Sequence, residues 1–169
     1  ERPPVVGRMP SILAARRPEP LEEVLRDIQS RDGLAEILPV DAMNPSAINH
    51  HLDEVTDRFG PVTLMFNAIP WDDIQGQVLS DIPFEQFFAP IQAGLTTWFH
   101  TGITLAKHMS QHAGGTILGI TANAGREPQF GVGGFGVACA DVEHYLRQLA
   151  VENGPKQVRV CLFSEPGTP

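Results

Sequence analysis

The sequence predicts an α/β fold built on a parallel sheet. Short apolar runs alternate along the chain with segments whose apolar residues recur at helical spacing. Strands that alternate with helices need crossover connections, which produce parallel strands covered on both faces. We expect one domain over residues 1–169, with loose ends at 1–10 and 165–169.

The first part of the chain predicts three strands and two helices. Leu21, Val24, Leu25 and Ile28 recur at i, i+3, i+4 and i+7, as in an amphipathic helix. A second helix begins near Pro45, which suits a first helical turn, and ends at Gly60. The expected strands cover residues 11–15, 34–40 and 62–66. The last of these runs is continuously apolar, as expected of a strand buried on both faces.

The second part continues the alternation. Turn residues fill the segment 70–83, and helical stripes of apolar residues follow at 84–91 and 95–109. A strand over 116–121, a glycine-rich loop, a helix around 142–149 and a strand over 158–163 complete the pattern. The sequence contains no internal repeat.

Composition excludes several classes of function. The net charge of −8 and the pI near 5.1 argue against binding to nucleic acid or to an anionic membrane surface. No apolar run approaches the ~20 residues of a membrane helix. Two cysteines, Cys139 and Cys161, favour a reducing compartment, so we expect a cytoplasmic protein.

Several fragments occur in the order and spacing of one known family. They are Ala14-Ala15-Arg16-Arg17, Leu38-Pro39-Val40-Asp41, Phe66-Asn67-Ala68-Ile69, Gly94-Leu95-Thr96-Thr97-Trp98-Phe99, and Arg159-Val160 followed by Pro166-Gly167. Over about residues 10–167 the chain resembles the short-chain dehydrogenase/reductase family. The resemblance implies a Rossmann-like, doubly wound parallel sheet and relatives that use NAD or NADP.

The catalytic positions of that family hold different residues here. The family uses an Asn, a Ser, a Tyr and a Lys, and the matching positions are Gly94, Ala122, Phe135 and Cys139. Phenylalanine has no hydroxyl to exchange a proton, and cysteine cannot carry a fixed positive charge. The resemblance therefore implies an SDR-like protein without catalytic residues, a pseudoenzyme.

The match to the family is also incomplete. The family opens with a central strand and a Gly-rich turn that holds the cofactor pyrophosphate. Only Val5-Val6-Gly7 precedes the equivalent of the family's second strand, and the C-terminal end is short. A missing central strand would leave unpaired backbone groups on two strands. The N-terminal segment, a partner chain or further sequence could fill this gap.

Three residues mark a remnant cofactor site. Arg16 matches the position that contacts the 2′-phosphate of NADP, Asp41 the position that faces the adenine, and Asn67 the family's Asn-rich turn. A structural role for Asp41 and Asn67 is favoured, and Arg16 and Arg17 equally suit a solvated turn. We expect no bound cofactor, and NADP or NAD only if a remnant pocket survives.

The remaining polar residues favour structural roles. His108 and His112 are four apart, a spacing that can share a metal, but without a nearby third ligand we expect solvated side chains and no metal. His50 and His51 are expected at the surface. Cys139 is expected to be a small core residue rather than a reactive thiol.

Oligomerisation is the expected mode of action. The resemblance implies that helices 94–109 and 136–152 pair with a second subunit, as a homodimer or a heteromer, with Trp98, Phe99 and Phe88 offering apolar area. Two other functions stay open. One is an NAD(P)-dependent oxidoreductase completed by a partner or by further sequence. The other is a non-redox enzyme that binds a small apolar ligand in a pocket lined by Trp71, Phe130 and Phe135.

Overall fold

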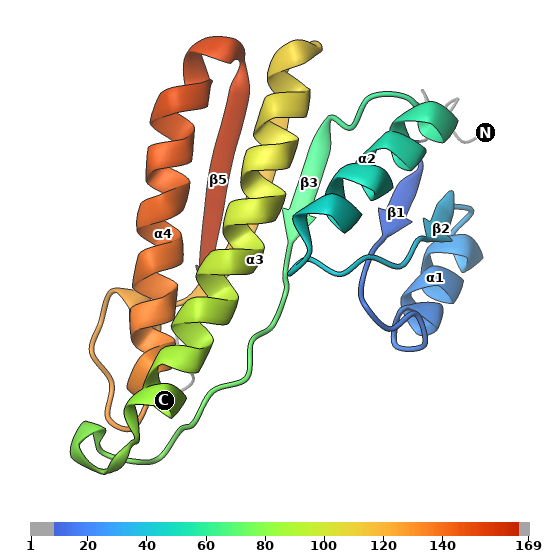
Figure 1. Cartoon of the computed structure of the whole chain (residues 1–169). Helices are drawn as coiled ribbons and strands as arrows, with labels where there is room; N and C mark the ends of the chain where they lie inside the picture. Colours follow the sequence, from blue (N-terminus) through green and yellow to red (C-terminus); the bar gives the residue numbers. More distant parts are fainter. Residues whose placement is uncertain (1–8, 166–169) are drawn as a thin grey trace. The chain divides into compact units, whose positions relative to one another are not determined.

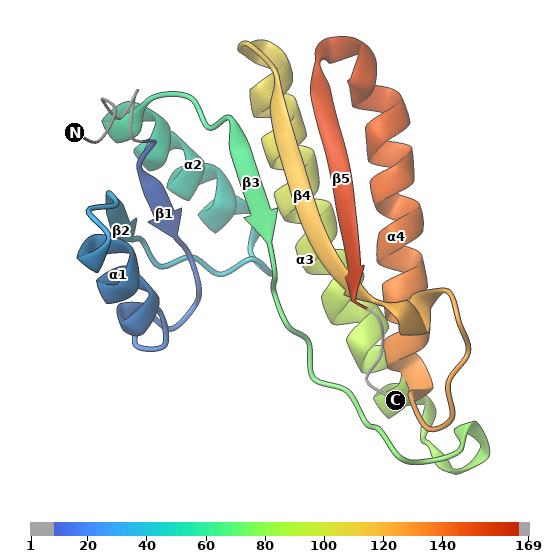
Figure 2. The same ribbon diagram turned by 180° about the vertical axis from the view of Figure 1, so that it is seen from behind.

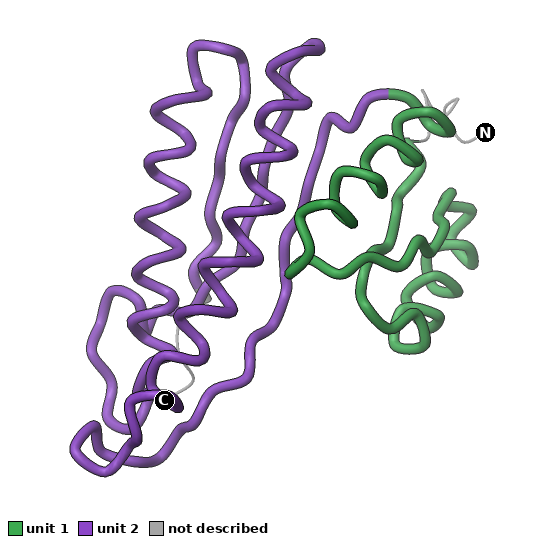
Figure 3. The backbone as a smooth tube through the Cα atoms, in the orientation of Figure 1, with its two compact units in different colours: residues 1–60 green, residues 61–169 purple. Residues whose placement is uncertain are grey.

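The computed structural model describes residues 9–165 and confirms the α/β class. The chain divides into two compact units, residues 1–60 and 61–169 (Figure 3). Val5-Val6-Gly7 and Pro166-Gly167 lie outside the described residues. A single domain over the whole chain stays a prediction.

The first unit contains two parallel strands and two helices (Figure 1). Strand β1 pairs with β2 in the register Ser11↔Ala35. The Asn44 side chain caps α2 by accepting hydrogen bonds from the backbone N–H groups of Ser46 and Ala47, and Gly60 ends the helix at φ +88°. The elements are β1 (Ser11–Leu13), α1 (Leu21–Ser30), β2 (Ala35–Ile37) and α2 (Pro45–Phe59).

The second unit contains a three-stranded parallel sheet in the order β3-β4-β5. The two helical stripes predicted at 84–91 and 95–109 belong to one continuous helix, α3, which contains Pro90. The elements are β3 (Leu64–Asn67), η1 (Leu79–Asp81), α3 (Phe84–Gln111), β4 (Gly115–Ala122), η2 (Asn123–Gly125), α4 (Gly133–Asn153), η3 (Gly154–Lys156) and β5 (Val158–Glu165).

Helices α3 and α4 both lie on one face of this sheet (Figure 2). Trp98 is only 1% exposed, because Gly119 of β4 leaves room for its ring. A Cβ atom at Gly119 would lie 2.5 Å from Cη2 of Trp98. The core continues along α4 through Val142, Leu146 and Leu149. Within residues 9–165, no helix is both long and apolar enough to cross a membrane.

The prediction that the strand at 62–66 is buried on both faces is wrong. Leu64 and Phe66 are 50% and 57% exposed. They share the face of the sheet opposite α3 and α4 with Cys161 and Phe163, which are also exposed. No described element of the second unit covers that face, so its apolar residues stay accessible.

The strands form two separate sheets. Among the described residues, β1 pairs only with β2. Strand β3 pairs only with β4, so one edge of β3 has no strand beside it among these residues. Each of the two units therefore contains its own parallel sheet.

Candidate functional site

The four positions matched to the family's catalytic set lie in the second unit, around the end of β4 and the start of α4. Ala122 is the last residue of β4, Gly94 lies in α3, and Phe135 and Cys139 lie in the first turns of α4. The segment that follows β3 brings Trp71 onto this group. A Cβ atom at Gly94 would lie 3.2 Å from Cε3 of Trp71, so the indole ring lies directly over Gly94.

Trp71 also contacts Phe135. The centroids of the two rings are 6.1 Å apart and the ring planes are tilted by 47°. Phe135 is therefore half-buried against another aromatic ring. Phe130 is 83% exposed, so of the three residues predicted to line an apolar pocket only Trp71 and Phe135 lie against each other.

Cys139 is a core residue, as predicted. Its side chain is fully buried, and a Cβ atom at Gly125 would lie 2.8 Å from the Cβ of Cys139. Burial raises the pKa of the Cys139 thiol, and the nearby carboxylates of Glu143 and Asp73 raise it further. A hydrogen bond with the backbone of Ala122 lowers the pKa and offsets part of this rise. The thiol therefore stays protonated at neutral pH and has little nucleophilic character.

Two buried polar atoms near the carboxyl ends of β3 and β5 have no hydrogen-bond partner within the described residues 9–165. They are Nε1 of Trp71 and Oγ of Ser164. A buried donor without an acceptor is costly, so such groups in native proteins commonly meet water or a ligand. Ligands of open parallel sheets bind at this carboxyl edge.

A buried carboxylate, Glu143, lies near Cys139 and the end of β4 and was not identified from the sequence. Its Oε1 accepts a hydrogen bond from Oγ1 of Thr121 at 3.0 Å, and its Oε2 accepts from Nε of Arg126 at 2.8 Å. Arg147 contacts the same Oε2 at 3.5 Å. The only sequence signal was Arg147 four residues after Glu143 on the helix.

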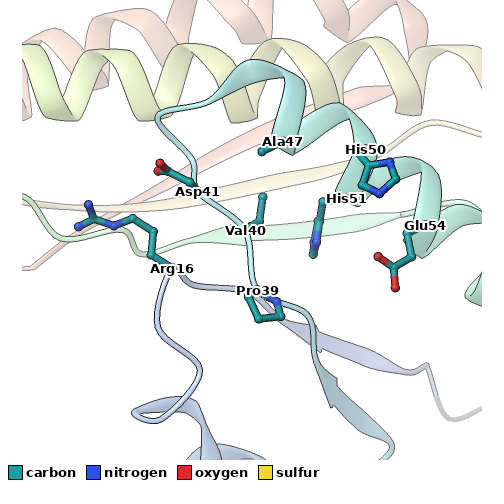
Figure 4. Close-up of a pocket in the computed structure, with 8 residues that line it drawn as sticks. All are labelled: Arg16, Pro39, Val40, Asp41, Ala47, His50, His51 and Glu54. Carbon is teal, nitrogen blue, oxygen red and sulfur yellow. The ribbon is translucent and has the colours of Figure 1, made fainter.

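A cleft of about 380 Å³ in the first unit contains two of the three predicted cofactor residues (Figure 4). Arg16 and Asp41 lie at one end of the cleft, and His50 and Glu54 of α2 lie at the other. Oδ1 of Asp41 accepts a hydrogen bond from the backbone N–H of Met43 at 3.0 Å, while the Arg16 side chain is exposed. The lining residues are Arg16, Pro39, Val40, Asp41, Ala47, His50, His51 and Glu54.

His51 is half-buried in this cleft. Burial lowers its pKa by disfavouring the charged imidazolium, and the nearby Glu54 carboxylate offsets part of that effect. His51 is therefore neutral at pH 7 and can both donate and accept a hydrogen bond. The prediction that His50 and His51 both lie at the surface holds for His50, which is exposed.

Asn67 belongs to the other unit and is engaged in structural hydrogen bonds. Its Nδ2 donates to Oγ1 of Thr101 at 3.0 Å, and its Oδ1 accepts from the backbone N–H of Ile69 at 3.0 Å. These contacts join the end of β3 to α3. They favour the structural role of Asn67, although the side-chain partner is on a helix rather than on the neighbouring strand.

The prediction that both His108 and His112 are solvated is wrong for His108. His108 is 9% exposed, and its Nε2 accepts a hydrogen bond from the backbone N–H of Val62 at 3.1 Å. This bond fixes the segment that leads into β3. Between residues 9 and 165, no group of three His, Cys, Asp or Glu side chains is arranged to hold a metal ion.

The outward face of α3 carries an apolar stripe. Phe88, Leu95, Phe99 and Ile103 are between 38% and 49% exposed and follow one another at seven- and four-residue spacing. Trp98, which was expected to offer area to a partner, lies in the core instead. Tyr145 of α4 extends the stripe, since its ring lies 6.0 Å from that of Phe99.

Comparison with known proteins agrees with this geometry. The short chain dehydrogenase family matches residues 9–168. A 2,3-dihydro-2,3-dihydroxybenzoate dehydrogenase of Bacillus subtilis is 21% identical over 151 residues, which are 89% of this chain and 57% of that protein.

Solved structures show the same fold. A short-chain dehydrogenase/reductase from Mycobacterium ulcerans superimposes with a TM-score of 0.85 at 19% identity, over 93% of this chain and 58% of that one. A metagenomic short-chain oxidoreductase in complex with NADP superimposes with a TM-score of 0.80 at 25% identity, over 93% of this chain and 70% of that one.

Fold and family model together define a Rossmann-like α/β protein of the dehydrogenase type. The chain belongs to the short-chain dehydrogenase/reductase family. It spans a little over half the length of the curated relative described above.

Proposed function

We propose that this chain is a non-catalytic member of its family that acts through association with another subunit. The observation that carries the proposal is the position of Trp71 over Gly94 and against Phe135. The two aromatic rings lie where the family resemblance puts proton-transferring groups. Neither side chain can exchange a proton with a substrate.

Residues around the aromatic pair support the same proposal. Cys139 is buried and uncharged at neutral pH, so it cannot replace a lysine. Thr121 has a hydroxyl, but it donates to Glu143 and faces α4. Tyr145 is the chain's one tyrosine, and its hydroxyl donates to the backbone carbonyl of Phe99, away from Phe135 along the helix.

Turnover measurements test the proposal. Purified protein is mixed with NADPH or NADH and a panel of ketones and aldehydes, and cofactor oxidation is followed by absorbance. We expect none above the rate without protein. Turnover that Phe135→Ala abolishes while thermal stability is unchanged would overturn the proposal.

The apolar stripe of α3 is the proposed association surface. Single exposed apolar residues are normal, but a contiguous stripe of four is typical of an interface. We propose that two copies of the chain form a homodimer through α3 and α4. The alternative is a heteromer with a different member of the family. The free thiols of Cys139 and Cys161 favour a cytoplasmic setting.

Mass measurement by light scattering tests the association. We expect a dimer for the unmodified chain and a monomer for Phe99→Lys, because a buried unpaired charge is costly. Val24→Lys on α1 is the matched control, since Val24 is 45% exposed on a helix of the other unit. A monomeric unmodified chain that binds a family relative would support the heteromer, and a monomer without such binding would contradict the proposal.

A second candidate function is an NAD(P)-dependent oxidoreductase completed by other sequence. It is favoured by the cleft that contains Arg16 and Asp41. These residues fit the adenosine end of the cofactor, because a guanidinium suits a phosphate and a carboxylate accepts N–H and O–H groups. No glycine-rich turn that would hold the pyrophosphate occurs between residues 9 and 165.

Fluorescence titration with NADPH separates the two candidates. Tight binding that Arg16→Gln weakens, while the surface control Arg26→Gln does not, would favour the oxidoreductase. Absence of binding favours the non-catalytic subunit.

A further inference from the structure

Glu143 is the most deeply buried charged side chain of the described structure, with only 1% of its surface exposed. An isolated buried carboxylate is strongly unfavourable, so its partners decide what it does. Those partners come from three places: Thr121 on β4, Arg126 just after η2, and Arg147 one turn further along α4. Glu143 therefore connects a strand end, a turn and a helix.

The turn that Arg126 belongs to is tightly folded. The backbone N–H groups of Arg126 and Glu127 both donate to the carbonyl oxygen of Asn123, at 2.8 and 2.9 Å. Nδ2 of Asn123 donates in return to Oε2 of Glu127 at 2.8 Å. The segment 123–127 is thus a compact hydrogen-bonded turn, and the Arg126–Glu143 ion pair links it to α4.

The same turn packs closely on the part of α4 that carries the candidate site. A Cβ atom at Gly136 would lie 2.9 Å from the carbonyl oxygen of Ala124, and one at Gly125 would lie 2.8 Å from the Cβ of Cys139. Displacing the turn would therefore uncover Cys139 and the backbone beside Phe135.

Beyond the turn, the chain reaches the segment that carries Trp71. The backbone N–H of Gly76 donates to the carbonyl oxygen of Gly131 at 2.7 Å. Trp71 lies five residues before Gly76 and contacts Phe135. The loops 70–78 and 126–132 are thus joined to each other and, through Arg126, to Glu143.

We propose that Glu143 is a positioning residue that holds the turn 123–127, and through it the Trp71–Phe135 pair, in the observed arrangement. The carboxylate acts through Arg126, whose side chain is half exposed and whose Nε makes the shortest contact of the cluster. Arg147 contacts the same oxygen from one turn further along α4, at 3.5 Å. This inference concerns the conformation of the site and does not depend on the proposed function.

Hydrogen exchange of the full chain, followed by mass spectrometry, tests the proposal with the pair Arg126→Gln and Arg147→Gln. Each change removes one positively charged side chain that contacts Oε2 of Glu143. We expect Arg126→Gln to speed exchange in residues 123–132 and 70–78 by roughly threefold to tenfold, as for the loss of a charged hydrogen bond at a partly solvated site. Arg147→Gln should leave both segments unchanged.

Tryptophan emission of the native state gives a second measurement, which a general loss of stability would leave unchanged. Arg126→Gln should shift the emission in the native state, and the shift should vanish in a Trp71→Phe background, where Trp98 alone remains. Arg126→Lys keeps the positive charge. In the hydrogen-exchange experiment it should therefore exchange more slowly than Arg126→Gln in residues 123–132 and 70–78.

Two results would overturn the proposal. One is equal exchange in the Arg126→Gln and Arg147→Gln variants, which would make the ion pairs interchangeable. The other is faster exchange spread over β3, β4 and β5, which would reduce Glu143 to a general contribution to stability. Because Arg126 is half exposed, the variant is expected to fold.

Discussion

Gly134 meets the backbone of Phe87 so closely that a Cβ atom at Gly134 would collide with the Phe87 carbonyl oxygen. The first turn of α4 therefore rests directly on the first turns of α3. A backbone oxygen cannot swing away as a side chain can, so the contact fixes how the two helices begin.

Replacing Gly134 by alanine should destabilise the protein by about 1–3 kcal/mol, because the added methyl group forces the helices apart. Chemical denaturation measures the change. Gly154→Ala is the control, since no heavy atom lies within 4 Å of a Cβ there and the residue has helical φ of −54°. We expect a change within about 0.5 kcal/mol for the control, and similar losses in both variants would contradict the close contact.

Gly94→Asn should displace the indole ring of Trp71, which lies 3.2 Å from the position of the new Cβ. We expect a loss of about 1–2 kcal/mol in unfolding free energy. A Trp71→Ala change should remove that clash, so the double variant should be more stable than the sum of the single changes predicts. Strict additivity would show that the ring is not held over Gly94.

His108→Leu should cost about 1–3 kcal/mol, because the backbone N–H of Val62 would lose its acceptor in a part-buried position. Urea unfolding measures the loss. His144→Ala, at an exposed position on α4, should change stability by less than about 0.5 kcal/mol. A His108 variant as stable as the control would mean that the hydrogen bond contributes nothing.

Tyr145 gives a prediction at high pH. Burial raises its pKa to about 12, and the Glu152 carboxylate adds to the shift. The unfolded chain ionises near pH 10, so between pH 10 and 12 the folded state binds more protons and stability falls as pH rises.

The measurement is direct because the chain has a single tyrosine. Absorbance near 295 nm should titrate with a midpoint about two units above that of the denatured chain. Tyr145→Phe should remove this contribution to the loss of stability above pH 10. A midpoint near 10 in the native state would refute the buried environment.

Local patterns predicted most elements of the fold. The helix 45–59 was found from Pro45 and Gly60 because caps and terminators act within a few residues. The orientation of α3 was harder to predict, because that helix is apolar on two sides. Periodicity alone does not tell which side meets the sheet, so Trp98 was assigned to an interface although Gly119 admits it to the core.

The site depends on contacts between residues far apart in the sequence, and these were the least predictable. Thr121 and Glu143 are 22 residues apart, and Val62 and His108 are 46 apart. Neither separation in the sequence indicates that the two residues are in contact. Trp71 and Phe135 are in contact, as the hypothesis of an apolar pocket required, but the position of Trp71 over Gly94 follows only from the path of the loop after β3.

The two cysteines differ in a way that makes the chain convenient for spectroscopy. Cys161 is exposed on the uncovered face of the β3-β4-β5 sheet, whereas Cys139 is buried and its thiol is held protonated. A maleimide dye or spin label should therefore attach at Cys161 alone in the native protein, without any substitution. Such a probe would report directly on whatever molecule comes to lie against Phe66 and Phe163.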